Sequence, residues 1–383
     1  MPERINCIQH PRRESRDARE RKELISRGAR TKPQSKTMLT WKLPRLVTVQ
    51  QVPKVFHEDS IICGYRSPQS SATACILSLF QMTNETVNIW THFIPTWYFL
   101  WKMLSMLFCH ESLHDPFLWP LLVFMLSCCI YPLASTCAHT FSIMSTQARH
   151  ICFFFDYGAL SLYSLGSAIA YSTYVFPDRW VNSLFHQWFV TCAVLNTIIC
   201  TGMACYSRLG APLLHYNQLL IERFPEVARP RFSKVLRTTA FGYPYFFDTI
   251  PLFYRLFLCS GSDCTQNATV TLHIGHTFLA LLTGFLFATH LPERLAPGRF
   301  DYVGHSHQLF HVCAILGTYI QMEALIMDMN LRRSWFEKNG SLPSLSSTLG
   351  AWSLALALSL LLVIGFSWAL YWKPEPEKKK RRM

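Results

Sequence analysis

His307 and His311 are four residues apart, a spacing that lets one helix present two imidazoles to a single metal ion. A third histidine, His139, follows an apolar segment earlier in the chain and can complete a set of three protein nitrogens. Three such ligands with one open position are typical of a zinc site that activates a water molecule. Asp156 is then a candidate to hold or deprotonate that water, and Ser135 a candidate hydrogen-bond donor. For the pair alone, contact with lipid headgroups at a membrane surface is the competing interpretation.

A second polar group, Glu85, Asn88 and His92, stands at the start of another apolar segment. Ionisable residues within membrane helices are costly and are usually functional. We interpret this group as a structural polar brace that joins helices by hydrogen bonds, in preference to a second catalytic set. Asp248 also lies within an apolar segment, where a ligand contact and an interhelical hydrogen bond are equally compatible with its position.

The elements that carry these residues are long apolar runs. About 20 apolar residues in a helix cross the ~30 Å hydrocarbon layer of a bilayer, and half of this 383-residue chain is hydrophobic. The runs predict an all-α integral membrane protein with eight transmembrane helices. We expect them at 89–108, 118–140, 151–175, 181–205, 236–259, 272–291, 306–328 and 348–372.

Positive charge sets the expected orientation. The chain has 36 Lys and Arg residues and a net charge of +13, and most of these residues fall in segments that share one side if the N-terminus is cytosolic. This arrangement favours a membrane surface over nucleic acid as the partner of the basic residues. It also places the polar ends of helices 1, 2, 3 and 7, with all three histidines, at the cytosolic face.

The remaining segments complete the expected organisation. Residues 1–37 are basic and poor in apolar side chains, which indicates a disordered cytosolic extension. The other expected parts are a cytosolic N-terminal segment with an interfacial helix (38–88), a seven-helix core (89–328), an outer loop (329–347), the eighth helix (348–372) and a basic cytosolic tail (373–383).

Several long strings of residues resemble the progestin and adipoQ receptor (PAQR) family over about residues 38–372. The matching blocks run from Phe80 to His92, Ser135 to His139, His150 to Gly158, His290 to Asp301 and His305 to His311. Within the family, the segment from Gly64 to Thr73 and the eighth helix resemble the membrane progestin receptors of the delta or gamma kind. The loop at 206–235 is longer than this resemblance predicts.

The resemblance implies a seven-helix core with an intracellular zinc site whose ligands are His139, His307 and His311, beside Asp156 and Ser135. It implies a plasma-membrane receptor for progestins or related steroids that signals rapidly, with G proteins as candidate partners. The same site also fits a zinc-dependent, ceramidase-like hydrolase of sphingolipid amides, and a purely structural zinc is a third alternative. The sequence assigns no ligand-binding residues; Gln321, Tyr319 and Asp248 are the polar candidates.

Overall fold

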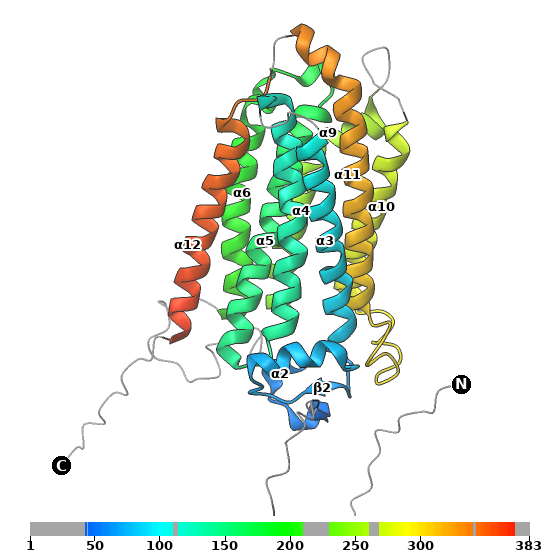
Figure 1. The fold of residues 1–383 in the computed structure, drawn as a ribbon, viewed down its shortest axis with the longest axis vertical. Helices are drawn as coiled ribbons and strands as arrows, with labels where there is room; N and C mark the ends of the chain where they lie inside the picture. Colours follow the sequence, from blue (N-terminus) through cyan, green and yellow to red (C-terminus); the bar gives the residue numbers. More distant parts are fainter. Residues whose placement is uncertain are drawn as a thin grey trace, which may run out of the picture. The chain divides into compact units, whose positions relative to one another are not determined.

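The computed structural model describes residue 43 and residues 45–109, 114–209, 230–259, 268–339 and 342–371. The expected N-terminal extension, the basic tail and most of the 206–235 loop lie outside the described residues. Within the described ranges, long helices run side by side as a bundle (Figure 1). The helices of this bundle carry every candidate site residue named above except Glu85, which directly precedes α3.

Helices occupy all eight ranges that the apolar runs predict. They are α3 (Thr86–Cys109), α4 (Trp119–Phe141), α5 (Thr146–Tyr174), α6 (Leu184–Leu209), α8 (Pro230–Asp248) with α9 (Ile250–Phe253) and η8 (Tyr254–Leu258), α10 (Thr269–Thr289), α11 (Ser306–Asn339) and α12 (Ala351–Tyr371). Among the described residues, five helices are long and apolar enough by themselves to cross a membrane: those that contain α4, α6, α10, α11 and α12. The prediction of an all-α, multi-pass membrane protein is confirmed.

α3, α5 and α8 fall short of that hydropathy because they carry polar side chains. Some of these side chains pair with neighbouring helices inside the bundle. Tyr163 of α5, for example, donates a hydrogen bond to Gln321 of α11 at 2.6 Å. Such helices are stable in lipid because neighbouring helices satisfy their polar groups. They therefore belong to the membrane bundle although their composition alone does not identify them.

α11 continues eleven residues beyond its predicted end at 328, as far as Asn339. Charged side chains on this extension bind loops at the same end of the bundle. Arg332 forms an ion pair with Asp178 at 2.5 Å, and Arg333 forms one with Asp115 at 2.6 Å. These ion pairs hold a helix end that hydropathy does not predict.

A small cap formed by residues 45–85 covers one end of the bundle (Figure 1). Its antiparallel strands β1 (Leu46–Val47) and β2 (Tyr65–Arg66) pair Leu46 with Arg66. Gly64 precedes β2 with φ +84°, and a Cβ there would lie 2.9 Å from the Tyr302 ring, so the turn requires glycine. The short helices, here and in the loops, are η2 (Val49–Gln51), η3 (Lys54–Phe56), α2 (Ala72–Leu77), η4 (Ser78–Phe80), η6 (Pro116–Leu118), η7 (Asp178–Trp180) and η9 (Ser346–Gly350).

α4 and α5 cross closely in the interior of the bundle. A Cβ on Gly166 of α5 would lie 2.6 Å from the Ser127 hydroxyl oxygen of α4, so a small residue is needed for this approach. The same hydroxyl accepts a hydrogen bond from the Trp352 indole of α12 at 2.9 Å. This bond attaches the eighth helix to the interior of the seven-helix core.

A buried ionic cluster joins η8, α10 and α11. The Arg255 guanidinium donates two hydrogen bonds to Asp328, at 2.8 and 2.9 Å, and a ring nitrogen of His273 lies 2.7 Å from the same carboxylate. Thr269 donates a further bond to Asp328 at 2.9 Å. The Asp328 side chain is fully buried, so these bonds replace the water that its charge would otherwise bind.

Hydrogen bonds continue from this cluster along the interior of the bundle. His273 contacts His276 at 3.0 Å, and the His276 ring lies 3.4 Å from the Tyr171 hydroxyl. Gln321, Tyr163, Thr318 and Tyr131 extend the chain through contacts of 2.6–3.1 Å. The Tyr131 ring then packs edge-on against His92, with ring centres 5.8 Å apart.

We expect Asp328→Asn to destabilise the protein by about 3 kcal/mol or more, because the buried Arg255 charge would then face a neutral amide. Glu323→Gln is a matched control on the same helix. Glu323 pairs with Lys102 at 2.9 Å, but both side chains are more than a quarter exposed, so we expect a loss of about 1 kcal/mol or less. Thermal unfolding in detergent measures both variants, and equal losses would contradict the assigned role of the cluster.

Candidate functional site

His139, His307 and His311 meet at the end of the bundle that carries the cap. One ring nitrogen from each lies within 4.8 Å of the others. The His139 and His307 Nε2 atoms are 3.2 Å apart, and the His307 and His311 ring centres are 4.6 Å apart. Residues separated by 168 positions in sequence therefore present their ring nitrogens to one point, as their shared depth in the membrane predicted.

The start of α11 fixes two of these histidines. Glu293 accepts a hydrogen bond from the Ser306 backbone nitrogen at 2.6 Å and another from the Ser306 hydroxyl. A carboxylate at this position satisfies an unpaired N–H and is stabilised by the helix dipole. The His305 ring also bonds to the Asn84 carbonyl oxygen at 3.2 Å. The first turn of α11, with His307 and then His311, is thereby held against the cap and α3.

The third histidine, His139, lies near the end of α4, and Arg66 holds that end in place. Arg66, from β2 of the cap, donates hydrogen bonds to the backbone carbonyl oxygens of His139 at 2.5 Å and Thr140 at 2.8 Å. The last carbonyls of a helix have no partner within it, and a cation is favoured there by the helix dipole. Arg66 is only 3% exposed, so its contact with the end of α4 is an interior one, and it sets where His139 lies.

Hydrogen bonds also set the tautomers of two of the histidines. His139 Nδ1 lies 2.8 Å from Glu85 Oε2, which also accepts a bond from Asn88 at 2.8 Å. His311 Nδ1 lies 3.0 Å from the Asn88 carbonyl oxygen. Because an oxygen can only accept from a neutral imidazole, both Nδ1 atoms carry hydrogen and both Nε2 lone pairs are free. Metal-binding histidines are held in the same way, by a carboxylate or a carbonyl on the other ring nitrogen.

The surroundings of Glu85 favour its charged form. Burial raises the pKa of Glu85, but His139, Arg66 and Asn88 outweigh burial and hold that pKa below its usual range. The carboxylate is therefore charged and able to bind His139.

One pair of nitrogens in the donor set has the separation expected of two ligands on a tetrahedral metal ion. At a Zn–N distance of 2.0–2.1 Å, two nitrogens on such an ion lie about 3.3 Å apart. The 3.2 Å between His139 and His307 Nε2 is close to this value. Without a metal ion, two ring nitrogens at this distance need a proton between them. The three histidines together could hold a divalent metal ion.

Three other candidate residues lie on α5, α4 and α3. Asp156, on α5, interacts electrostatically with His139 and Arg208; among the described residues it is not one of the converging ligands. Ser135 is buried one helical turn before His139. His92 stacks on His311 with ring centres 3.7 Å apart.

The polar candidates for ligand binding have separate surroundings. The Gln321 amide is occupied by Tyr163, Ser167 and Tyr171. Asp248 accepts a hydrogen bond from Ser164 of α5, which is the interhelical bond that was one of its two interpretations. Tyr319 is 40% exposed on the surface of the bundle.

Sequence reasoning does not identify Arg66, Glu293 or Asp301 as supports of the site. Asp301 accepts hydrogen bonds from the backbone nitrogens of Ile62 at 3.0 Å and Cys63 at 2.7 Å. Each of these three residues bonds backbone groups, which carry no signature in the sequence. A charged residue within a long matching block, as Glu293 and Asp301 are, is the one signal available.

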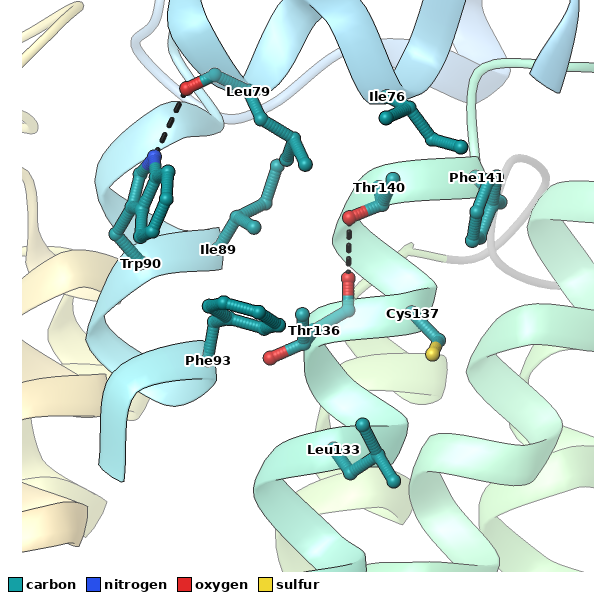
Figure 2. A pocket seen from close by; sticks show the side chains of 10 residues that line it. All are labelled: Ile76, Leu79, Ile89, Trp90, Phe93, Leu133, Thr136, Cys137, Thr140 and Phe141. Atoms are coloured by element: carbon teal, nitrogen blue, oxygen red, sulfur yellow. Dashed lines mark hydrogen bonds between the residues drawn. The ribbon is translucent and has the colours of Figure 1, made fainter. Parts of the chain in front are cut away.

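An apolar groove lies beside the site. It has a volume of about 190 Å³ and runs between α2 and η4 on one side and α3 and α4 on the other (Figure 2). Thr136 and Thr140 of its α4 wall are the immediate neighbours in sequence of Ser135, Cys137 and His139. The groove and the histidine cluster therefore share the same two turns of α4.

Comparison with known proteins extends these observations. Residues 80–322 match the family model described as haemolysin-III related. The chain is 61% identical over 336 residues to membrane progestin receptor gamma-B of Danio rerio, covering 88% of this chain and 97% of the relative. It is 54% identical to the human membrane progestin receptor gamma (90% and 99% covered) and 55% identical to the human delta protein (88% and 94% covered).

We expect His139→Ala, His307→Ala and His311→Ala each to abolish binding of a divalent metal ion by the full chain. Glu85→Gln should weaken binding by about 10- to 100-fold, because it removes the group that orients His139. His186→Ala is the control, since His186 bonds the Ser172 carbonyl oxygen at a distant turn. Metal titration and elemental analysis of protein in nanodiscs measure the effect; unchanged metal content in the three alanine variants would contradict the site.

Proposed function

The chain belongs to the haemolysin-III-related, or PAQR, family of membrane proteins, and we propose that it is a membrane receptor for a progestin or a related steroid. The identity of 54–61% to proteins named membrane progestin receptors, over about nine-tenths of the chain, carries this proposal. Ligand pockets commonly lie between the helices of bundles and are mostly apolar. The aromatic interior of this bundle suits a flat, largely apolar ligand of this kind.

The proposal includes a cytosolic N-terminus and residence in the plasma membrane. The distribution of Lys and Arg supports this orientation. Cys259, at the end of η8, is in a disulfide bond, and η8 also carries Arg255 of the ionic cluster. Disulfides persist in oxidising compartments, which supports an extracellular position for that end and a cytosolic one for the cap and the histidines.

We propose zinc as the metal that His139, His307 and His311 would hold. Three imidazoles with a carboxylate behind one of them are a common zinc donor set. Such an ion would supply a Lewis acid at the level of the cap. The chain's own residues orient the imidazoles through Glu85 and Asn88 and keep the site buried.

A zinc-dependent lipid amide hydrolase is the second candidate function. The observation that favours it is the interaction of the Asp156 carboxylate with His139, one of the three histidines that could hold a metal ion. In this role Asp156 would accept a proton and Ser135 would donate a hydrogen bond to a substrate oxygen. Ceramide, which is an apolar sphingolipid amide, is the matching substrate class.

Purified, zinc-loaded protein in nanodiscs tests both functions in one sample. We expect saturable progesterone binding by the wild type and equally by Asp156→Ala, because Asp156 lies at the candidate metal site and makes no contact required of a receptor. Absence of saturable binding by the wild type would overturn the receptor proposal.

The same nanodiscs report on hydrolysis through release of fatty acid from ceramide. If the second function holds, Asp156→Ala should lower the rate by roughly 10²- to 10⁴-fold, since it removes a general base. Asp59→Ala is the matched control because the Asp59 side chain is 78% exposed in the cap. Release that is absent in the wild type, or unchanged in Asp156→Ala, would overturn the hydrolase.

A further inference from the structure

We propose that the groove between the cap and helices α3 and α4 binds the ketone end of a steroid, with the Thr136 hydroxyl as its hydrogen-bond donor. This inference rests on the proposed steroid receptor function and gives it a location. It depends on three observations: the shape and lining of the groove, an unpartnered hydroxyl on its α4 wall, and its opening on the lipid-facing surface.

The exposed surface of the groove is apolar. Ile76 and Leu79 form the wall on the cap side, Ile89 and Phe93 form that of α3, and the side chains of α4 close the third side (Figure 2). No charged side chain lines it. An ionic headgroup would gain no partner here, so the chemistry favours an uncharged and rigidly apolar occupant.

The side-chain N–H and O–H groups of Trp90 and Thr140 on these walls are bonded within the chain. The Trp90 indole donates to the Leu79 carbonyl oxygen at 2.9 Å, and the Thr140 hydroxyl donates to the Thr136 carbonyl oxygen at 2.7 Å. The Thr136 hydroxyl, by contrast, has no partner among the described residues. It is also shielded from solvent, since Thr136 is only 7% exposed. Figure 2 shows this hydroxyl on the side of α4 that faces Phe93.

An unpaired buried hydroxyl costs about 1–3 kcal/mol, so a native structure normally supplies it with a partner. In a groove whose exposed surface is apolar, an acceptor oxygen on an otherwise apolar molecule would satisfy this hydroxyl. A steroid ketone has this chemistry: it accepts a hydrogen bond, carries no charge and is attached to a flat hydrocarbon frame. The volume of about 190 Å³ fits one end of the molecule and leaves the rest along the helices.

The groove opens toward the surface that lipid would cover. Ile76 is 47% exposed and Leu133 is 45% exposed at its edges, and Phe80 of η4 is 73% exposed nearby in sequence. Large exposed apolar side chains of this kind are expected on a lipid-facing surface. A steroid dissolved in the bilayer can therefore enter sideways, without crossing the cap.

Affinity for tritiated progesterone, measured with the full chain in nanodiscs, tests the contact with Thr136. We expect Thr136→Val to weaken binding by about 3- to 10-fold, the effect of one hydrogen bond, and Thr136→Ser to restore it. Thr283→Val is the control, since the Thr283 hydroxyl bonds within α10 to the Leu279 carbonyl oxygen. Metal content should be equal in all variants, which separates the groove from the histidine cluster.

Cys137 provides an independent readout because its exposed side chain lines the groove. We expect progesterone to slow maleimide labelling of Cys137, measured against Cys137→Ser to subtract the other cysteines. Labelling that is blocked in nanodiscs without steroid and returns in detergent would overturn the proposal, because a bilayer lipid would then be the occupant.

Two further results would overturn the proposal: unchanged affinity in Thr136→Val, or labelling of Cys137 that progesterone does not slow. In both cases progesterone binding by the wild type remains measurable, so the receptor function would stand and only its location would fail. If the wild type binds no progesterone, the receptor function itself fails.

Discussion

The membrane interior offers no water to polar side chains, and this constraint determines how the bundle is organised. A charged group inside it is stable only where another part of the chain bonds to it. Arg255, His273 and Thr269 surround Asp328 for this reason, and Tyr131 and Thr318 continue the chain of bonds toward the histidines. These contacts select one alignment of α10 and α11 among the many that apolar packing alone would allow, because any other alignment leaves a buried charge unpaired.

The same constraint prepares the histidine cluster for its chemistry. Glu85 and the Asn88 carbonyl occupy the Nδ1 atoms of His139 and His311, which leaves the Nε2 lone pairs of these two rings free. His307 Nε2 lies 3.2 Å from His139 Nε2, and a contact of this kind is stabilised by a shared proton or by a cation that both nitrogens bind. The brace predicted for Glu85 and Asn88 and the metal site predicted for the histidines are thus parts of one arrangement, since the brace aims the ligands.

The sequence predicts the features that depend on composition and local spacing. Long apolar runs locate the helices, and the four-residue spacing of His307 and His311 places both on one helix face. His139 joins them through topology, because alternating spans return it to the same end. Other features depend on tertiary packing. They are the bond between Glu85 and His139, the contact of Arg66 with the end of α4, and the burial of Arg255. A sequence gives the charge of such residues, but it does not show which distant backbone group or side chain each of them binds.

α4 links the groove to the histidine cluster. Thr136 and Thr140 line the groove, while Ser135 and His139 lie on the adjacent face of the same two turns. Arg66 holds the end of these turns, and Ser78, at the start of η4, accepts a hydrogen bond from Arg66 at 3.3 Å. A molecule in the groove therefore contacts both α4 and the segment that Arg66 ties to the end of α4. The two turns of α4 that line the groove are the ones that hold His139, whereas α11 holds His307 and His311 separately.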